Sequence, residues 1–246
     1  MNLTGKNIIL TGASRIGKTM AEELAKAGAN LAITYLSSEE TAREICEEAG
    51  KFGVKAIAVK ADVSREDDVR NLIEEAKKQL GQIDGLIHMA ANYPKTPFDK
   101  VTVEDFDKTM AIIARSTFLM GKLVGDEMLK NPNALKGKII TISDWSVLRA
   151  PYRDYLPYNM AKAAVEGATL SLAQELAPGI AVNCIAPGPI LKPEDLTEEE
   201  NQAVLSRTPL RKWGGAEEIA KAVLYLLDSD FTTGVILPVD GGRSIA

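Results

Sequence analysis

The chain has 246 residues, of which 46% are hydrophobic and 26% charged, and its formal net charge is −5. This balance is typical of a folded globular protein and excludes a disordered or fibrous chain. Acidic and basic residues are interspersed, so no basic face for nucleic acid is predicted. No apolar run approaches the roughly 18 residues of a membrane helix, and no leader segment precedes the first predicted strand. We therefore expect a cytoplasmic protein that binds neither nucleic acid nor membrane.

The chain contains two cysteines and one histidine. Cys46 and Cys184 lie far apart and form no paired motif, so reduced thiols are expected rather than a disulfide. With His88 as the only histidine, a zinc site built on histidines is excluded. No metal site is predicted.

Strand-like and helix-like patterns alternate along the chain. The apolar run Asn7–Leu10 predicts the first strand, and Met20 and Leu24 then recur at helical spacing until Gly28 ends the helix. The predicted strands are Asn7–Leu10, Asn30–Tyr35, Val54–Val59, Ile83–Met89, Lys138–Ser143, Ile180–Ile185 and Gly234–Val239. Later helical segments include Thr102–Met128, Tyr155–Leu176 and Ala216–Leu227.

This alternation implies crossover connections and a parallel sheet covered by helices on both faces. No repeat, linker or shift in composition divides the chain. We predict a single doubly wound Rossmann α/β domain over residues 1–246, with a parallel seven-stranded sheet. In such sheets ligands bind beyond the carboxyl ends of the strands.

The segment after the first strand has the features of a nucleotide-binding loop. Residues 12–19 read G-x-x-x-x-G-K-T, the phosphate loop of ATPases, in which Lys18 contacts phosphates and Thr19 contacts magnesium. With one position missing, the same residues read as the glycine loop of a dinucleotide-binding unit. The two interpretations are incompatible, and residues further along the chain decide between them.

Tyr158 and Lys162 lie four residues apart at the start of a predicted helix and therefore share a face. A tyrosine hydroxyl has a pKa of about 10, and a nearby ammonium lowers that pKa by roughly 1–3 units. Such a pair suits proton transfer to a carbonyl oxygen during hydride transfer.

Six short motifs, in order, make the chain resemble the short-chain dehydrogenase/reductase family. The resemblance covers nearly the whole chain and argues against the phosphate loop. It implies an enzyme that moves hydride between a nicotinamide cofactor and its substrate. The motifs are Thr11–Gly17, Ala61–Val63, Lys138–Ser143 with the polar residue after it, Tyr158 with Lys162, Asn183–Gly188 and Leu237–Gly242.

The resemblance also implies a role for each matching residue. Tyr158 is the general acid in reduction, and Lys162 lowers its pKa and holds the nicotinamide ribose. Asp62 contacts adenine, and the Pro187-Gly188 turn contacts the carboxamide. The implied cofactor-binding residues are Gly12, Ser14, Arg15, Ile16, Gly17, Tyr35, Ser37, Ser38, Asp62, Val63, His88, Ala90, Tyr158, Lys162, Pro187, Gly188 and Ile190.

The end of the second strand indicates which cofactor is used. NAD binding usually places an acid there, but Tyr35 is followed by Leu36, Ser37 and Ser38. Arg15 stands in the glycine loop, where the family often has a cation for the 2′-phosphate. We therefore expect NADP (NADPH) rather than NAD.

Four features depart from the family's pattern. Asp144 replaces the usual active-site serine, as in the pteridine-reductase branch, unless Ser143 takes that role. His88 stands at the end of the fourth strand and either contacts the cofactor or stabilises the strand end. Ile112 or Ile113 occupies the position of the proton-relay asparagine, and the loop lacks its middle glycine.

These features predict an NADPH-dependent reductase of a carbonyl or imine, with Tyr158, Lys162, Asp144 and Ser143 as catalytic residues. Dihydropterins compete with 3-oxoacyl-ACP and other small ketones as substrates, and a non-catalytic NADP-binding sensor is the alternative from another class. Candidates to stack on a flat substrate ring are Tyr152, Tyr155 and Trp213. In the family, the helices corresponding to Thr102–Met128 and Tyr155–Leu176 pair subunits, so we expect a homotetramer, with a dimer as the alternative.

Overall fold

Seven strands form one parallel sheet in a computed structural model that describes residues 1–12 and 15–246. Their spatial order is β3-β2-β1-β4-β5-β6-β7. The strands β1 to β3 therefore extend the sheet in one direction, and β4 to β7 extend it in the other. This arrangement confirms the predicted doubly wound α/β fold. The strands are β1 (Asn7–Thr11), β2 (Asn30–Tyr35), β3 (Ala56–Lys60), β4 (Gly85–His88), β5 (Gly137–Ile142), β6 (Ile180–Pro187) and β7 (Ile236–Val239).

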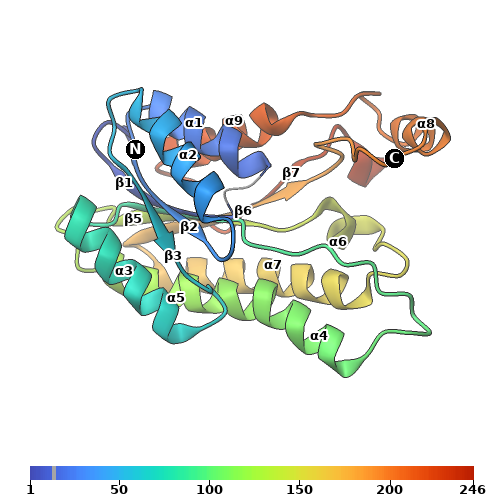
Figure 1. Ribbon diagram of the computed structural model, residues 1–246, viewed down its shortest axis with the longest axis horizontal. Coiled ribbons are helices and arrows are strands. Elements are labelled where there is room, and N and C mark those ends of the chain that lie inside the picture. The colour runs from blue at the N-terminus through green and yellow to red at the C-terminus, as the bar shows by residue number, and fades with distance from the viewer. Residues whose placement is uncertain (13–14) are drawn as a thin grey trace.

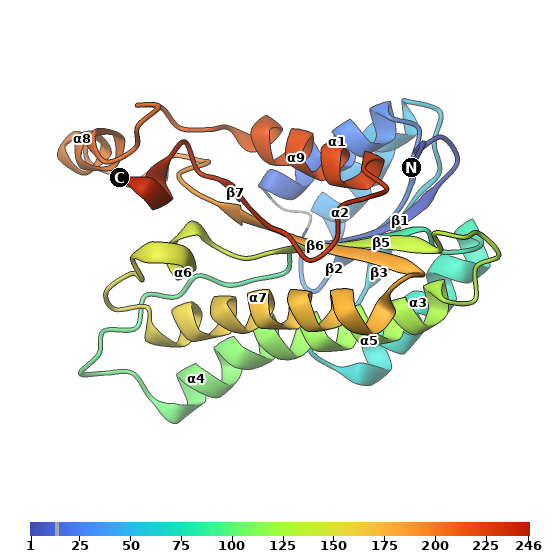
Figure 2. The same ribbon diagram turned by 180° about the vertical axis from the view of Figure 1, so that it is seen from behind.

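Helices cover both faces of the sheet (Figure 1 and Figure 2). One face carries α1 (Ile16–Lys26), α2 (Glu39–Gly50) and α9 (Ala216–Asp228). The other face carries α3 (Glu66–Leu80), α4 (Val103–Met110), α5 (Ser116–Met128) and α7 (Leu156–Leu176). Three short helices follow the carboxyl ends of β5, β6 and β7: α6 (Trp145–Arg149), α8 (Glu198–Ser206) and η2 (Arg243–Ile245). In the part of the chain described, no helix is both long and apolar enough to cross a membrane.

Successive residues of the central strand β1 pack on opposite faces of the sheet. Ile8 and Leu10 belong to the core under α1 and α9, whereas Ile9 belongs to the core under α3, α5 and α7. All three side chains are buried. Burial on both faces explains why a continuous apolar run, rather than an alternating one, marks this strand.

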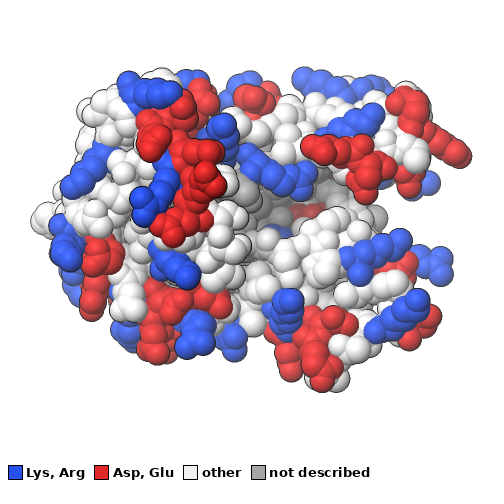
Figure 3. All heavy atoms as spheres, in the orientation of Figure 1, with Lys and Arg blue, Asp and Glu red and all other residues white. Residues whose placement is uncertain are grey.

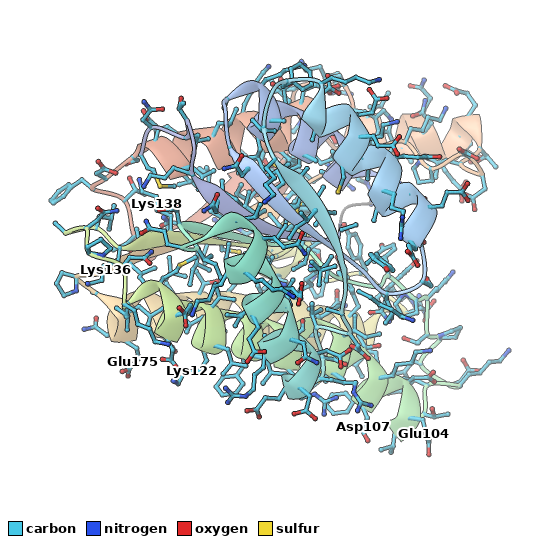
Figure 4. All side chains as sticks on the ribbon, turned by 60° about the vertical axis from the view of Figure 1, so that its left-hand side comes forward. Glu104, Asp107, Lys122, Lys136, Lys138 and Glu175 are labelled. Atoms are coloured by element: carbon cyan, nitrogen blue, oxygen red, sulfur yellow. The ribbon has the colours of Figure 1, made fainter. Side chains whose placement is uncertain are left out.

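A buried lysine fixes the amino end of β5. Lys138 lies near Lys136 at one end of the sheet in Figure 4, and its side chain is inaccessible. The Nζ atom donates to the carbonyl oxygen of Ser229 (2.6 Å) and to Oδ1 of Asp230 (2.7 Å), just beyond α9. Because the cation is fully paired, its burial is tolerated. The strand is thus anchored far from the residues that follow its carboxyl end.

The predicted helix Thr102–Met128 is confirmed as one helical segment that contains an irregular turn. Between α4 and α5 lies a π-helical turn, η1 (Ala111–Arg115). Ser116 Oγ donates to the carbonyl oxygen of Ile112 (2.5 Å), four residues earlier. Side-chain hydroxyls that bond such carbonyls compete with backbone amides and distort a helix. Apolar periodicity alone gives no sign of this turn.

Candidate active site

A cleft follows the carboxyl ends of the strands and contains two pockets, which share Gly12 and Ala91. Figure 3 shows a hollow between the upper and lower halves of the molecule, with charges of both signs spread over the surrounding face. We call the two parts the β2 pocket, of about 300 Å³, and the Tyr158 pocket, of about 510 Å³. Both occupy the edge of the sheet at which a doubly wound fold binds its ligands.

The β2 pocket contains residues that follow β2, β3 and β4. Asp62 lines it, but Asp62 Oδ1 also accepts from the hydroxyl (2.6 Å) and amide (3.0 Å) of Ser64, so the carboxylate shapes the turn as well. Asn92 Oδ1 is buried without a hydrogen-bond partner among the described residues. The sequence-predicted cofactor residues that line this pocket are Gly12, Tyr35, Ser37, Ser38, Asp62, Val63 and Ala90.

The Tyr158 pocket lies beyond β5 and β6. The turn after β6 packs closely against the end of β7, since a Cβ on Gly188 would lie 2.5 Å from Asp240 Cα. The sequence-predicted residues that line this pocket are Gly12, Arg15, Ile16, Ser143, Asp144, Tyr158, Lys162, Pro187, Gly188 and Ile190. The structure therefore brings nearly all the predicted cofactor residues to one cleft.

Two glycines allow the loop after β1 to lie directly on the end of β4. Gly12 has φ of +72°, and a Cβ there would lie 2.9 Å from the amide nitrogen of Ala90. Gly17 lines neither pocket, and a Cβ on it would lie 2.5 Å from the carbonyl oxygen of Gly12. Its role is close packing of the loop against α1. The predicted contact at Ser14 lies outside the described residues.

The amino end of α1 fits an anionic group. Within the described residues, this end has no side-chain cap and no acid in its first turn. Helix N-terminal amides without acceptors attract phosphate. An anionic group therefore fits beside the glycine loop, and the unpartnered Asn92 oxygen can accept a hydrogen bond from a ligand in the β2 pocket.

The positions of two basic residues correct the predictions for this loop. Arg15 lines the Tyr158 pocket and not the β2 pocket, where Ser37 and Ser38 lie, so its predicted place beside the 2′-phosphate is not reproduced. Lys18 is exposed on α1, and neither Lys18 nor Thr19 lines the cleft. The phosphate-loop interpretation is therefore wrong.

Tyr158 and Asp144 form a direct contact inside the cleft. The Tyr158 hydroxyl donates to Asp144 Oδ2 at 2.8 Å, and Asp144 Oδ1 accepts from the amide of Ser146 at 2.9 Å. Lys162 Nζ lies 5.8 Å from the centre of the Tyr158 ring and donates to the carbonyl oxygen of Ile142 at 2.8 Å. As their spacing predicted, Tyr158 and Lys162 lie on the same face of α7.

The pKa of Tyr158 moves in the direction opposite to the prediction. Burial raises that pKa above its usual value, and the charge and hydrogen bond of Asp144 raise it further. Burial also lowers the pKa of Lys162. The sequence shows which charged residues stand near Tyr158, but it does not show that the Tyr158 hydroxyl is buried away from water. Tyr158 therefore carries its proton at neutral pH and is ready to act as an acid.

Ser143 and Asp144 point to different partners. The Ser143 hydroxyl donates to Glu166 Oε1 at 2.7 Å, on α7, and makes no hydrogen bond to Tyr158. Of the two candidates for the family's serine position, Asp144 is the one in contact with the tyrosine. The alternative in which Ser143 takes that role is not supported by the geometry.

The predicted contact of His88 with the cofactor is not reproduced. Its ring is buried, with Nδ1 2.9 Å from Thr11 Oγ1 and Nε2 2.9 Å from Ser116 Oγ. Burial and the charge of Lys162 lower the pKa of His88 to about 3, so the ring is neutral. Thr11 Oγ1 already accepts the amides of residues 89 and 90, so its hydroxyl donates to Nδ1. Nε2–H then donates to Ser116, and His88 joins β4 to the π-helical turn.

Aromatic side chains form one wall of the Tyr158 pocket. Tyr152 and Trp213, predicted as stacking residues, line the pocket, but Tyr155 packs behind Tyr93, with ring centres 4.4 Å apart. Trp145 Nε1 donates to the Tyr152 hydroxyl at 2.7 Å. Further lining residues missed at the sequence level are Tyr93, Trp145 and Arg243. Each of them follows the carboxyl end of a strand (β4, β5 and β7, respectively) by three to five residues, and this position was the available signal.

The fold, the cleft and the Tyr158–Lys162 pair define a nucleotide-dependent oxidoreductase of the doubly wound class. A family model described as enoyl-(acyl carrier protein) reductase matches residues 12–244. Glucose 1-dehydrogenase 2 of Bacillus subtilis is 32% identical over 99% of this chain and 96% of its own length. L-rhamnose 1-dehydrogenase (NADP(+)) of Thermoplasma acidophilum is 34% identical over 100% of this chain and 98% of its own. The chain belongs to the short-chain dehydrogenase/reductase family.

Solved structures agree with this assignment. A blue fluorescent protein from a metagenomic library, in complex with NADPH, is 33% identical with a TM-score of 0.89, over 99% of this chain and 100% of that one. An NAD+-bound xylitol dehydrogenase is 26% identical with a TM-score of 0.89, over 98% and 100%. The chain is an NAD(P)-dependent oxidoreductase, and the named relatives include users of either cofactor.

Proposed function

We propose that the protein is an NADPH-dependent reductase in which Tyr158 protonates the oxygen or nitrogen that gains the new hydrogen. The observation that carries this proposal is the protonated Tyr158 hydroxyl at the Tyr158 pocket, bonded to Asp144 and close to Lys162. When bound, the nicotinamide supplies the hydride. Reduction needs a group that still holds its proton at neutral pH, and burial together with Asp144 raises the pKa of Tyr158 and so keeps its hydroxyl protonated there.

Asp144 is positioned to return a proton to Tyr158. Its Oδ1 atom is occupied by the Ser146 amide, whereas Oδ2 accepts the tyrosine proton. A phenolate beside a carboxylate is electrostatically unfavourable, so the tyrosine regains a proton soon after donating one. A carboxylate that accepts the Tyr158 hydrogen bond has no proton to give, so Asp144 Oδ2 takes one up from solvent before passing it to the phenolate at hydrogen-bond distance. Ile112 and Ile113, at the usual relay position, have no side-chain group that exchanges protons.

The aromatic wall supports a flat substrate, and two classes remain as proposals. Dihydropterins carry a flat ring with nitrogens to which Asp144 or Tyr158 can donate, whereas 3-oxoacyl thioesters and other ketones offer a carbonyl oxygen. Neither curated relative named above is described as a pteridine reductase. Initial rates with NADPH on a dihydropterin, an acetoacetyl thioester and aryl ketones test the proposal. Absence of turnover on the whole panel contradicts it.

We predict a preference for NADPH that Ser37→Asp reverses. The β2 pocket has Ser37 and Ser38 where an acid for the ribose hydroxyls of NAD would stand, and this supports NADP. A carboxylate at position 37 repels a 2′-phosphate, so affinity for NADPH should fall about tenfold or more, a change of about 1.4 kcal/mol. Titration of both cofactors measures the effect. Ser37→Asn is the neutral control of matching shape, and a wild type that binds NADH more tightly contradicts the prediction.

We also propose a homotetramer built on the outer faces of α4, α5 and α7. Gly121 on α5 serves the chain's own packing, since a Cβ there would clash with Leu172. Exposed apolar side chains on these helices still suit an interface, chiefly Phe118 and Leu170. Charged residues of the same layer, including Glu104 and Lys122, also point outward (Figure 4).

Light scattering after size exclusion is expected to give a tetramer for the wild type. A charge buried in an interface without a partner is strongly unfavourable, so Phe118→Glu and Leu170→Glu should each yield smaller species. Phe52→Glu, at the end of α2 on the opposite face, is the control and should leave the tetramer intact. A monomeric wild type at micromolar concentration contradicts the proposal.

A further inference from the structure

Arg243 reaches the Tyr158 pocket from a well-fixed turn near the carboxyl end of the chain. Asp240 is buried, and its two carboxylate oxygens accept the amides of Gly242 (2.9 Å) and Ser244 (2.7 Å). Gly242 has φ of +85° and packs so closely on Pro209 that a Cβ would lie 2.8 Å from its ring. Only glycine suits both conditions. The turn therefore gives Arg243 a defined direction.

The guanidinium of Arg243 lies on the aromatic wall. Its Cζ is 5.0 Å from the centre of the Trp145 ring, and Nη1 donates to the carbonyl oxygen of Val204 in α8 at 3.2 Å. Trp145 is itself fixed by its bond to Tyr152, whose ring centre lies 6.5 Å from that of Tyr158. The wall thus leads from Arg243, through Trp145 and Tyr152, to the proposed proton donor.

This cation lacks a counter-ion. Among the described residues, no carboxylate lies within 4.0 Å of Arg243, and the bond to Val204 is the only hydrogen bond that its guanidinium makes to the protein. Burial, and then the neighbouring charge of Arg207, lower the pKa of Arg243. A guanidinium has five N–H donors, so several remain for a ligand. A half-buried cation of this kind gains most from an anion with two oxygens.

Besides Arg243, the pocket lining contains the cations Arg15 and Lys162 and the polar residues Ser143 and Asp144, and most of the remaining lining is apolar or aromatic and suits a flat ring. Apart from Asp144, whose two oxygens are occupied by Tyr158 and Ser146, no carboxylate is found among the described residues that line it. We infer that Arg243 binds a substrate carboxylate, and that the enzyme reduces flat, aromatic carbonyl compounds that carry an acid group remote from the reacting carbonyl. This inference rests on the proposed reductase function for the identity of the reacting group, but the carboxylate site stands on its own contacts.

The test compares 4-acetylbenzoate with 4-acetylbenzamide, which have the same ketone and nearly the same shape but differ in charge. With NADPH, wild type should show a kcat/KM about tenfold or more higher for the acid, a difference typical of a charge-assisted pair. Arg243→Gln should reduce this ratio to about 1, mainly by raising KM for the acid. Arg243→Lys keeps the charge and should keep part of the preference. Arg207→Gln removes an exposed neighbouring charge and should leave the ratio unchanged.

Equilibrium binding separates this inference from the proposed function. Benzoate and benzamide are titrated against tryptophan fluorescence in the presence of NADP+, since Trp145 lies under the guanidinium. Tighter binding of benzoate that is lost in Arg243→Gln supports the carboxylate site even if neither ketone is turned over, and in that case only the reductase proposal fails. Equal binding of benzoate and benzamide to wild type overturns the inference. The inference is also overturned if Arg243→Gln weakens the binding of benzoate and of benzamide equally and Arg243→Lys does not restore it. In that case the role of Arg243 is to pack against Trp145.

Discussion

Tyr158→Phe is expected to lower kcat by about 10²- to 10⁴-fold while affinity for NADPH stays within about twofold of wild type. The substitution removes one hydroxyl, which donates to Asp144 and is the proposed source of the proton. The ring remains, so its packing against Tyr93 and Tyr152 is kept. Steady-state rates and fluorescence titration of NADPH measure the two quantities.

Tyr155→Phe is the matched control for this variant. It removes the same hydroxyl from a residue that stacks on Tyr93 but does not line the Tyr158 pocket. Its rates should stay close to those of wild type. If Tyr158→Phe retains more than about a tenth of the activity, the hydroxyl is not the acid. If it loses NADPH binding together with turnover, the residue acts on the cofactor and not on proton transfer.

Asp144→Asn is expected to shift the pH dependence of both reaction directions toward lower pH. Burial raises the pKa of Tyr158, and the Asp144 charge adds to that rise. Removal of the charge lowers the pKa toward its usual value of about 10. Reduction uses the protonated tyrosine, so the fall in the reduction rate at alkaline pH should begin at a lower pH in the variant than in wild type. Oxidation uses the deprotonated form, so its gain of rate should also begin at lower pH.

Rate profiles in both directions, from about pH 6 to about pH 11, test this expectation around the tyrosine pKa. Asparagine retains an oxygen for the Ser146 amide, so the start of α6 is preserved. Glu166→Gln is the control, because Glu166 accepts from Ser143 and is not among the groups that raise the pKa of Tyr158. If the pH profile of Asp144→Asn matches that of wild type, the Asp144 carboxylate does not determine the pKa of Tyr158.

The sheet was predictable because its central strands, such as β1 and β4, are buried on both faces and are largely apolar. Asn30–Tyr35 is reproduced without change as β2, and β5 and β6 differ from their predictions by one or two residues. The π-helical turn was missed because it depends on Ser116, whose hydroxyl bonds a carbonyl oxygen instead of solvent. The Ser116 hydroxyl bonds a carbonyl oxygen because that face of the helix is buried, and the spacing of apolar residues does not reveal this burial.

The candidate site was predictable where residues lie directly after a strand. Tyr35, Asp62 and Pro187 all line the cleft for that reason. The direction of the Tyr158 pKa was wrong because desolvation depends on how the whole pocket closes around the ring. Arg243, at the end of the Asp240–Arg243 motif, was not predicted as a pocket residue because its contacts with Trp145 and Val204 join distant parts of the chain. Those contacts arise only once β7 has paired with β6.

The hydrogen-bond chain through His88 has a consequence for proton traffic in the cleft. Its donors all run one way, from the Thr11 hydroxyl to His88 and from His88 to Ser116, which in turn donates to a backbone carbonyl. A proton could pass along it only if every hydroxyl reversed. Since the imidazole is also neutral beside the charge of Lys162, it does not compete for the substrate's proton. The fold thus keeps the imidazole of His88 neutral and outside the proton exchange of the cleft.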